Sequence, residues 1–324
     1  MKWNFAFVVG LMLSSSLAAT AVNAQTVLKA ADIHPDGYPT VEAVIYMGKL
    51  VDERTHGRIK IQEFNNAVLG GEKDTIEQTQ FGVIDFNRVS TAQFNNVVPE
   101  TKVYGLPFLF RSVDHMHKVV DGPIGDEILA AFEAKGLIGL AYYDSGARSF
   151  YTKKPITKLA DMKGMKIRVQ QSDMWVAMMQ AFGANPTPMA FGEVYSALQT
   201  GVVDGAENNW PSYESTRHFE VAKYYTLTEH SLQPEVLTMS KKSYDKLSPE
   251  DQKIIRQAAK DSVVKMRELW SAREKSSEAK VRAGGAIVST VDKAEFIAAM
   301  KPVYDKYVTD DVTKKLVERI VAVK

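Results

Sequence analysis

The sequence predicts an α/β fold of two lobes, with a ligand cleft between the lobes and one long helix that spans both. Three observations support this prediction. Strand and helix patterns alternate along most of the 324 residues, which is the element order of an α/β protein. The alternation occurs in two blocks, residues 27–143 and 165–207. A helical stretch of about 35 residues then follows residue 248, and it is several times longer than an average helix.

The first block has the order strand, helix, strand, helix, strand. The expected strands are residues 27–33, 58–64 and 83–89, and the expected helices are 41–53 and 73–80. Residues 58–64 alternate polar and apolar side chains, as in a strand with one buried face. This order predicts a parallel sheet with right-handed crossovers. The block ends with helices at 113–120 and 125–135 and a strand at 137–143.

The second block repeats the alternation. Its expected elements are a strand at 165–169, a helix at 174–182, a loop through Pro186 and Pro188, a helix at 191–200 and a strand at 202–207. Further along the chain we expect strands at 237–240 and 287–291 and a last helix at 293–307.

The long helix has clear start and stop signals. Ser248 is a typical N-cap, Pro249 suits the first helical position and Asp251 places an acid in the first turn. Neither Gly nor Pro occurs again before Gly284, which is a natural stop. At 1.5 Å per residue such a helix is roughly 50 Å long. We therefore expect it to contact both lobes.

Residues 1–24 have the features of a cleaved secretory signal. Lys2 precedes an apolar run at residues 5–13, and Val22-Asn23-Ala24 is a small-x-small cleavage site. The run is shorter than the about 20 residues that span a bilayer. We expect an exported protein whose mature chain begins near Gln25. An uncleaved membrane anchor is the alternative.

The composition excludes several classes of site and partner. The chain has no cysteine, which rules out disulfides, thiolate metal sites and cysteine nucleophiles. The formal charge of +1 falls to 0 when Lys2 is removed with the signal, and no basic block occurs, so no nucleic-acid partner is expected. His115 and His117 are two residues apart on an expected helix and face apart, so no metal site is expected there.

Two arginines are the first candidates for a ligand site. In open α/β sheets, ligands bind beyond the carboxyl ends of the strands. Arg168, in GMKIRVQ (164–170), lies near the end of a strand and opposite Ile167 and Val169. Its planar guanidinium matches a carboxylate; a solvated surface charge is the alternative. Arg148 follows the strand at 137–143, and its alternative is an ordinary loop arginine.

Other polar residues also fall at expected strand ends. Asn208 is followed closely by Trp210, which together offer an amide and a flat apolar face, although Asn208 or Asn209 could instead cap the next helix. Glu72 follows a Gly-Gly turn at a helix start, where a carboxylate also favours the helix dipole. The remaining candidates lie at the ends of the first and third strands: His34, Arg88 and Ser90.

Three segments give the chain a specific resemblance. They are MKIRV (165–169), GANPTPM (183–189) and EVYSALQTGVVDGAEN (193–208). With these segments the chain resembles the solute-binding proteins of tripartite ATP-independent periplasmic (TRAP) transporters of the DctP type, and the resemblance covers the whole mature chain. Such proteins have a periplasmic-binding-protein-like fold, bind one small organic acid between two lobes and deliver it to a small and a large membrane subunit.

The resemblance also implies roles for particular residues. The family's arginine that pairs with the ligand carboxylate falls on Arg168, a second carboxylate-binding arginine of the sialic-acid members corresponds to Arg148, and the family's amide falls on Asn208. The chain crosses between lobes in this family, so each lobe is discontinuous. We expect residues 25–145 and 234–273 in one lobe and residues 146–233 and 274–324 in the other. No catalysis and no cofactor are implied, and we expect a monomer.

The ligand is expected to be a sugar acid. Glu72, Arg88, Ser90, His34 and Trp210 form a mixture suited to several hydroxyls. The segments HPDGYP (34–39) and NNWPSYE (208–214) are similar to the subgroup that binds hexuronates such as glucuronate and galacturonate. A C4-dicarboxylate, with Arg88 taking a second carboxylate, or a sialic acid are alternatives within the family. An exported uronate-processing enzyme is the alternative of another class.

Overall fold

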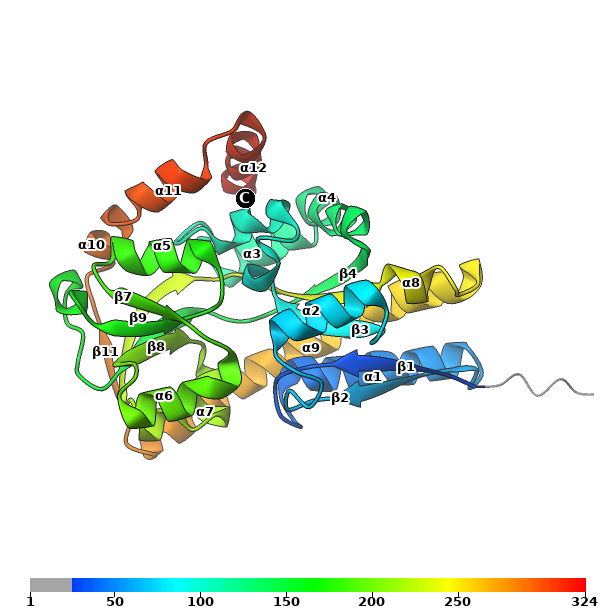
Figure 1. Ribbon diagram of the computed structural model, residues 1–324, viewed down its shortest axis with the longest axis horizontal. Coiled ribbons are helices and arrows are strands. Elements are labelled where there is room, and N and C mark those ends of the chain that lie inside the picture. Colours follow the sequence, from blue (N-terminus) through cyan, green and yellow to red (C-terminus); the bar gives the residue numbers. More distant parts are fainter. Residues whose placement is uncertain (1–24) are drawn as a thin grey trace, which may run out of the picture.

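The computed structural model describes residues 25–324 and contains two β-sheets flanked by helices, one sheet in each of two lobes (Figure 1). The predicted α/β fold is confirmed. The expected signal segment, residues 1–24, lies outside the described residues. Within residues 25–324, no helix is both long enough and apolar enough to cross a membrane.

The first sheet has the strand order β2-β1-β3-β10-β4. β1 pairs in parallel with β2 and β3, as expected for the first block, whereas β10 inserts antiparallel between β3 and β4. This insertion brings a strand from late in the chain into the first lobe. The strands are β1 (Thr26–Ala31), β2 (Ile59–Phe64), β3 (Phe86–Ser90), β4 (Leu137–Tyr143) and β10 (Glu235–Ser240).

The second sheet has the strand order β11-β9-β5-β8-β6-β7. Its strands are β5 (Arg148–Thr152), β6 (Lys166–Val169), β7 (Asn185–Pro188), β8 (Gly205–Asn208), β9 (Tyr224–Ser231) and β11 (Ile287–Thr290). The sequence patterns did not predict β5 and β9. The expected loop through Pro186 and Pro188 is the edge strand β7, where proline is tolerated because one edge needs no hydrogen bonds.

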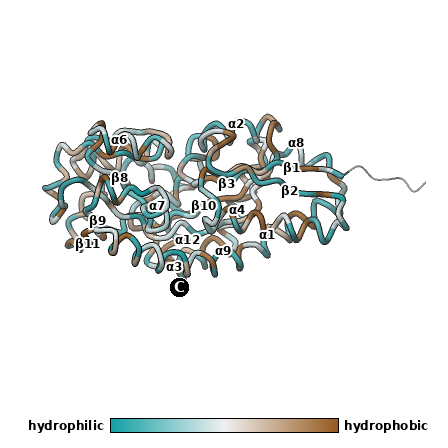
Figure 2. The backbone as a smooth tube through the Cα atoms, turned by 90° about the horizontal axis from the view of Figure 1, so that it is seen from below, coloured by the Kyte–Doolittle hydropathy of each residue, from teal (hydrophilic) through white to brown (hydrophobic). Residues whose placement is uncertain are grey.

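The helices of the first lobe cover both faces of its sheet. α1 (Pro39–Arg54) and the first part of α9 (Pro249–Ala283) lie side by side on one face (Figures 1 and 2). The other face carries α2 (Glu72–Phe81), α3 (Val113–Val120) and α4 (Pro123–Ala131). α4 packs closely on β4 because Gly139 has no side chain; a Cβ there would lie 2.8 Å from the Leu129 carbonyl oxygen. The short helix α8 (Lys241–Tyr244) follows β10.

The second lobe has its own helices. They are α5 (Asp173–Ala181), α6 (Val194–Thr200) and α7 (Trp210–Ser215). α6 and α7 pack on β5, β8 and β9 through a core that includes Tyr151, Leu198 and Tyr213. A second apolar cluster runs from α3 and α4 of the first lobe to α5 of the second, so the two lobes share part of their core.

The long helix α9 forms as predicted and contacts both lobes. The Ser248 hydroxyl accepts a hydrogen bond from the Asp251 backbone N–H, and Arg58 of the first lobe binds the Asp251 carboxylate with two N–H groups. Ile255 packs in the core of the first lobe, whereas Val281 packs in that of the second. The helix therefore links the lobes along one side, as Figure 1 shows.

The C-terminal part differs from the prediction of one helix at 293–307. It contains α10 (Lys293–Ala298), α11 (Lys301–Tyr307) and the unpredicted α12 (Asp311–Ala322). α12 returns to the first lobe, where the Ile320 carbonyl oxygen lies 2.9 Å from His115 Nε2 of α3. We predict that the chain crosses between the lobes at 145/146, 233/234 and 273/274, and this division stays a proposal. α12 falls in the second lobe by this division, yet it contacts the first.

Candidate functional site

A small cavity lies between the strand ends of the two sheets. It contains about 300 Å³ of space not filled by protein atoms, part of it open to solvent. Both lobes supply its walls, as expected for a cleft between α/β lobes. The lining residues are Ile33, His34, Glu72, Ser90 and Glu235 from the first lobe and Arg148, Arg168, Gln170, Phe191, Asn208, Asn209 and Ser212 from the second.

Arg168 is a buried cation without a carboxylate partner. It lies on β6 and is 2 % exposed. Its Nε and one Nη2 N–H donate to the Met189 carbonyl oxygen at 3.2 and 2.9 Å. A guanidinium has five N–H groups, so three remain, and no carboxylate of residues 25–324 lies within 4.0 Å of it. Burial lowers the pKa of Arg168, which reflects the cost of an unpaired charge.

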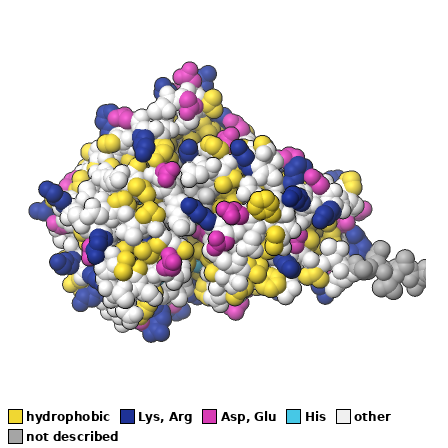
Figure 3. Space-filling model, viewed as in Figure 1, with side chains coloured by type: hydrophobic (Ala, Val, Ile, Leu, Met, Phe, Trp, Pro, Cys, Tyr) yellow, Lys and Arg dark blue, Asp and Glu magenta, His cyan; other side chains and the backbone are white. Residues whose placement is uncertain are grey.

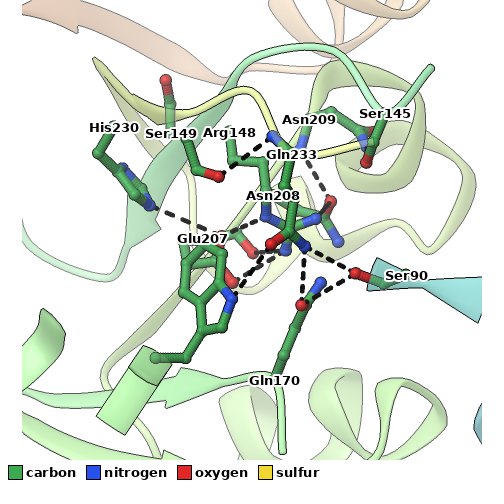
Figure 4. Close-up of polar contacts among 12 residues, drawn as sticks. Ser90, Ser145, Arg148, Ser149, Gln170, Glu207, Asn208, Asn209, His230 and Gln233 are labelled. Carbon is green, nitrogen blue, oxygen red and sulfur yellow. Dashed lines mark hydrogen bonds and ion pairs between the residues drawn. The ribbon is translucent and has the colours of Figure 1, made fainter. Parts of the chain in front are cut away.

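Arg148, in contrast, is paired with a carboxylate of the protein, that of Glu207. Its Nε and Nη2 bind the two carboxylate oxygens of Glu207 at 2.6 and 2.9 Å, and Nη1 donates to Asn208 Oδ1 at 2.8 Å (Figure 4). Nη2 also donates to the Glu207 carbonyl oxygen at 3.0 Å. Glu207 thus neutralises Arg148 and fixes its orientation. One Nη1 N–H stays available to a ligand.

Glu207 is fully buried and is bound to Arg148. His230 Nε2 lies 3.7 Å from its Oε2 (Figure 4). Burial on its own would raise the pKa of Glu207, but the Arg148 charge and His230 outweigh burial and leave this pKa below its ordinary value. Glu207 is therefore a carboxylate at neutral pH, and it positions Arg148 instead of contacting the ligand.

Arg88 forms the centre of a charge cluster behind the first-lobe wall. Its Nε and Nη2 donate to the Asp32 carboxylate, and Nη1 donates to Glu235 Oε2 at 2.8 Å. Glu72 Oε1 lies 3.6 Å from the same Nη1. Arg88 is 1 % exposed and does not line the cavity, whereas Glu72 and Glu235 do. Arg88 therefore binds acidic side chains of the protein. It is not placed to bind a second carboxylate of a ligand, as the C4-dicarboxylate alternative would require.

Glu72 faces the cavity from the first turn of α2. Its Oε1 also accepts a hydrogen bond from the Ser90 backbone N–H at 2.9 Å. Burial and the neighbouring Glu235 carboxylate raise the pKa of Glu72, although Arg88 acts in the opposite direction. The carboxyl group is thus placed where a ligand hydroxyl could donate to it.

His34 lines the cavity as a neutral ring. It stacks on Tyr38 with the ring centroids 3.7 Å apart, and its Nδ1 is buried without a hydrogen-bond partner among residues 25–324. Burial, together with the charges of Arg88 and Arg148, lowers the pKa of His34 well below its ordinary value. His34 therefore lines the cavity as an uncharged ring at neutral pH.

Ser90 takes part in a hydrogen-bond triad that joins the lobes. Ser90 Oγ donates to Gln170 Oε1 at 3.1 Å, and Gln233 Nε2 contacts both at 2.6 and 2.9 Å (Figure 4). Ser90 ends a strand of the first sheet, Gln170 follows a strand of the second, and Gln233 lies in the segment that connects β9 to β10. The triad therefore joins the lobes beside the cavity, which Ser90 and Gln170 line.

Trp210 does not reach the cavity. Its ring stacks on Tyr225 at 3.9 Å in the core of the second lobe. Asn209 explains this placement, because its side chain caps α7 by accepting from the Ser212 backbone N–H at 2.8 Å. The helix begins at Trp210 and turns the indole away from the ligand side.

Sequence reasoning thus found six residues that line the cavity: Arg168, Arg148, Asn208, Glu72, His34 and Ser90. It missed others, chiefly Gln170 and Glu235. Gln170 follows Arg168 by two positions on the same face of a strand, which is a signal that could have been used. Glu235 had no such signal, because its strand enters the first sheet from a distant part of the chain.

Comparison with known proteins identifies the family. The model of bacterial extracellular solute-binding protein family 7, DctP, matches residues 30–311. The chain belongs to this family. The resemblance of the three sequence segments is therefore confirmed.

Solved and curated DctP relatives are similar over almost their full length. A TRAP periplasmic solute-binding protein from a Bradyrhizobium species, in complex with α/β-D-galacturonate, is 60% identical with a TM-score of 0.90, covering 91% of this chain and 99% of that one. A protein of the same kind from Pseudomonas putida F1 with bound D-glucuronate is 46% identical with a TM-score of 0.90, covering 92% and 97%. A curated solute-binding protein from Chromohalobacter salexigens is 43% identical, covering 94% of this chain and 91% of its own.

Proposed function

We propose that this protein is the periplasmic subunit of a TRAP transporter that captures a hexuronate, such as D-galacturonate or D-glucuronate. The observation that carries the proposal is the buried guanidinium of Arg168. Arg168 lines the cavity, three of its N–H groups have no acceptor among residues 25–324, and an unpaired buried charge is costly. A ligand carboxylate would accept hydrogen bonds from these N–H groups and would neutralise the charge of Arg168.

The other cavity residues fit the hydroxyls of a sugar acid. Arg148 presents one N–H beside Arg168, and Asn208 lies next to it with its Oδ1 already used. On the first-lobe side, the carboxyl groups of Glu72 and Glu235 can accept hydrogen bonds, and His34 lines the cavity as a neutral ring. One carboxylate at one end and several acceptors at the other correspond to a hexuronate. The ligands of the solved relatives are of this class.

Capture would occur by closure of the lobes. The structure has direct contacts across the cleft, such as Tyr38 OH to Ser212 Oγ at 2.9 Å and Asn95 Nδ2 to Ser172 Oγ at 2.9 Å. A ligand shifts an open–closed equilibrium through the extra contacts that it makes in the closed form. Arg168 on one lobe and Glu72 on the other would supply these contacts.

We place the protein in the periplasm, exported by cleavage of residues 1–24, with the small and large TRAP membrane subunits as partners. Lys/Arg and Asp/Glu side chains are interspersed on the face in Figure 3 without a large area of one sign, which fits the absence of a nucleic-acid partner. We propose that the protein performs no catalysis, since Glu207 is bound to Arg148 and is not free to act as a base.

Isothermal titration calorimetry tests this function with four compounds: D-galacturonate, D-glucuronate, succinate and N-acetylneuraminate. We expect micromolar or tighter binding of a hexuronate, corresponding to about −8 kcal/mol or better, and no heat from the other two acids. Binding of succinate or N-acetylneuraminate alone would refute the substrate class. An NMR spectrum of the recovered hexuronate should show it unchanged, and a product would indicate the enzyme instead.

A further inference from the structure

The two walls of the cavity carry opposite charge. On the second-lobe wall, Glu207 neutralises Arg148, so Arg168 is the one guanidinium lining the cavity of the described chain that lacks a carboxylate partner. On the first-lobe wall, Glu72 and Glu235 line the cavity. The site therefore offers one positive charge on one side and acids on the other.

Arg88, the cation behind the first-lobe wall, already interacts with carboxylates of the protein. Arg88 binds the carboxylates of Asp32 and Glu235, and Glu72 lies 3.6 Å from it. Three carboxylates thus surround one guanidinium that is 1 % exposed. This group has no spare positive charge for a ligand.

From this arrangement we propose that Glu72 and Glu235 make the site selective for acids with a single carboxylate and exclude the dicarboxylates of the same carbon chain. The proposal rests on the proposed function, since it concerns the end of the ligand that is remote from Arg168. Arg168 lines the cavity from one lobe and Glu72 and Glu235 line it from the other, so a ligand that pairs with Arg168 places its remote end toward these two acids.

The preference for an acid with one carboxylate over a dicarboxylate follows from the group that each presents to Glu72 and Glu235. A hydroxyl donates a hydrogen bond to a carboxylate, and such charge-assisted bonds are about twice as strong as neutral ones. A second ligand carboxylate has no proton to donate and would lie beside two acids. Like charges in contact repel each other, which weakens the binding of an acid with a second carboxylate.

The test compares D-galacturonate with galactarate, which has the same six carbons with C1 oxidised to a second carboxylate and is therefore an open-chain compound. Affinities are measured by calorimetry, with displacement of galacturonate for weak binding. We expect the wild type to prefer galacturonate by at least about 100-fold. In Glu72→Gln we expect that ratio to fall by at least about tenfold, because one like charge is removed. Glu235→Gln should change the ratio in the same direction.

Glu77→Gln is the matched control, since Glu77 is exposed on the same helix and should leave the ratio unchanged. A wild-type ratio near one, or the same ratio in wild type, Glu72→Gln and Glu235→Gln, would overturn the proposal. So would the absence of detectable galactarate displacement in both Gln variants. Failure of the wild type to bind galacturonate at all would instead count against the proposed function.

Discussion

Arg168 and Arg88 show what can be predicted at the scale of a single residue. Both are arginines near strand ends, and the sequence made both candidates. The structure separates them by their partners. Arg88 binds Asp32 and Glu235, which lie 56 and 147 positions away in the chain. The one hydrogen-bond acceptor of Arg168 among residues 25–324 is a carbonyl oxygen. Which arginine is free depends on these distant contacts, and no local pattern records them.

Glu63 is a residue whose environment predicts a pH effect on stability. It lies on β2, and both its carboxylate oxygens are buried without a hydrogen-bond partner in residues 25–324. Burial and the nearby Asp32 raise the pKa of Glu63 from 4.5 to about 8, with Arg88 opposing them. Between these values the folded protein holds a proton that the unfolded chain releases. Stability contributed by Glu63 is therefore lost as the pH rises from about 4.5 to 8.

Thermal unfolding at pH 5 and pH 9 measures this effect. We expect Glu63→Gln to raise the melting temperature relative to wild type by a few degrees more at pH 9 than at pH 5, at roughly 2–4 °C per kcal/mol. Glu53→Gln, an exposed change on α1, is the control. An equal effect of Glu63→Gln at both pH values would contradict the raised pKa.

At the scale of elements, the sequence signals at the two ends of α9 were sufficient to predict this helix. The sequence patterns of the second sheet were not sufficient to predict all of its strands. Ser248, Pro249 and Gly284 mark both ends of the helix, and the structure has it at Pro249–Ala283. β5 and β9 carry no clean alternation because β5 is buried on both faces and β9 nearly so. A strand that is buried on both faces has an apolar or mixed sequence without alternation. Hydrophobic periodicity alone therefore cannot distinguish it from a loop or a helix.

The N-cap of α9 gives a prediction at this scale. Ser248 Oγ accepts from the Asp251 backbone N–H at 3.1 Å. Ser248→Ala removes this bond and should lower the free energy of unfolding by about 1 kcal/mol, as measured by urea denaturation. Ser276→Ala changes an exposed serine inside the same helix and should have a smaller effect. If both variants lose the same stability, the cap is not the cause.

At the scale of the whole molecule, the sequence predicted two lobes and one linking helix but not the return of the chain's end. α12 contacts the first lobe through His115, although it follows elements of the second. Together with α9 and the shared apolar cluster, it gives the lobes several connections on the side away from the cavity. The cavity side depends on polar contacts such as Tyr38 to Ser212, so closure there is the motion that a ligand can control.

The central claim is that one carboxylate of a hexuronate pairs with Arg168 when the lobes close. Calorimetry of D-galacturonate with Arg168→Gln tests it most directly. Arg217→Gln is the control, because Arg217 is exposed and its one ion pair among residues 25–324 is with Glu220, three positions along the chain. Removing one member of a buried charge pair costs about 3–5 kcal/mol. We predict that Arg168→Gln weakens binding by at least about 100-fold while Arg217→Gln binds as the wild type does. Near-normal affinity in a folded Arg168→Gln protein would contradict the account.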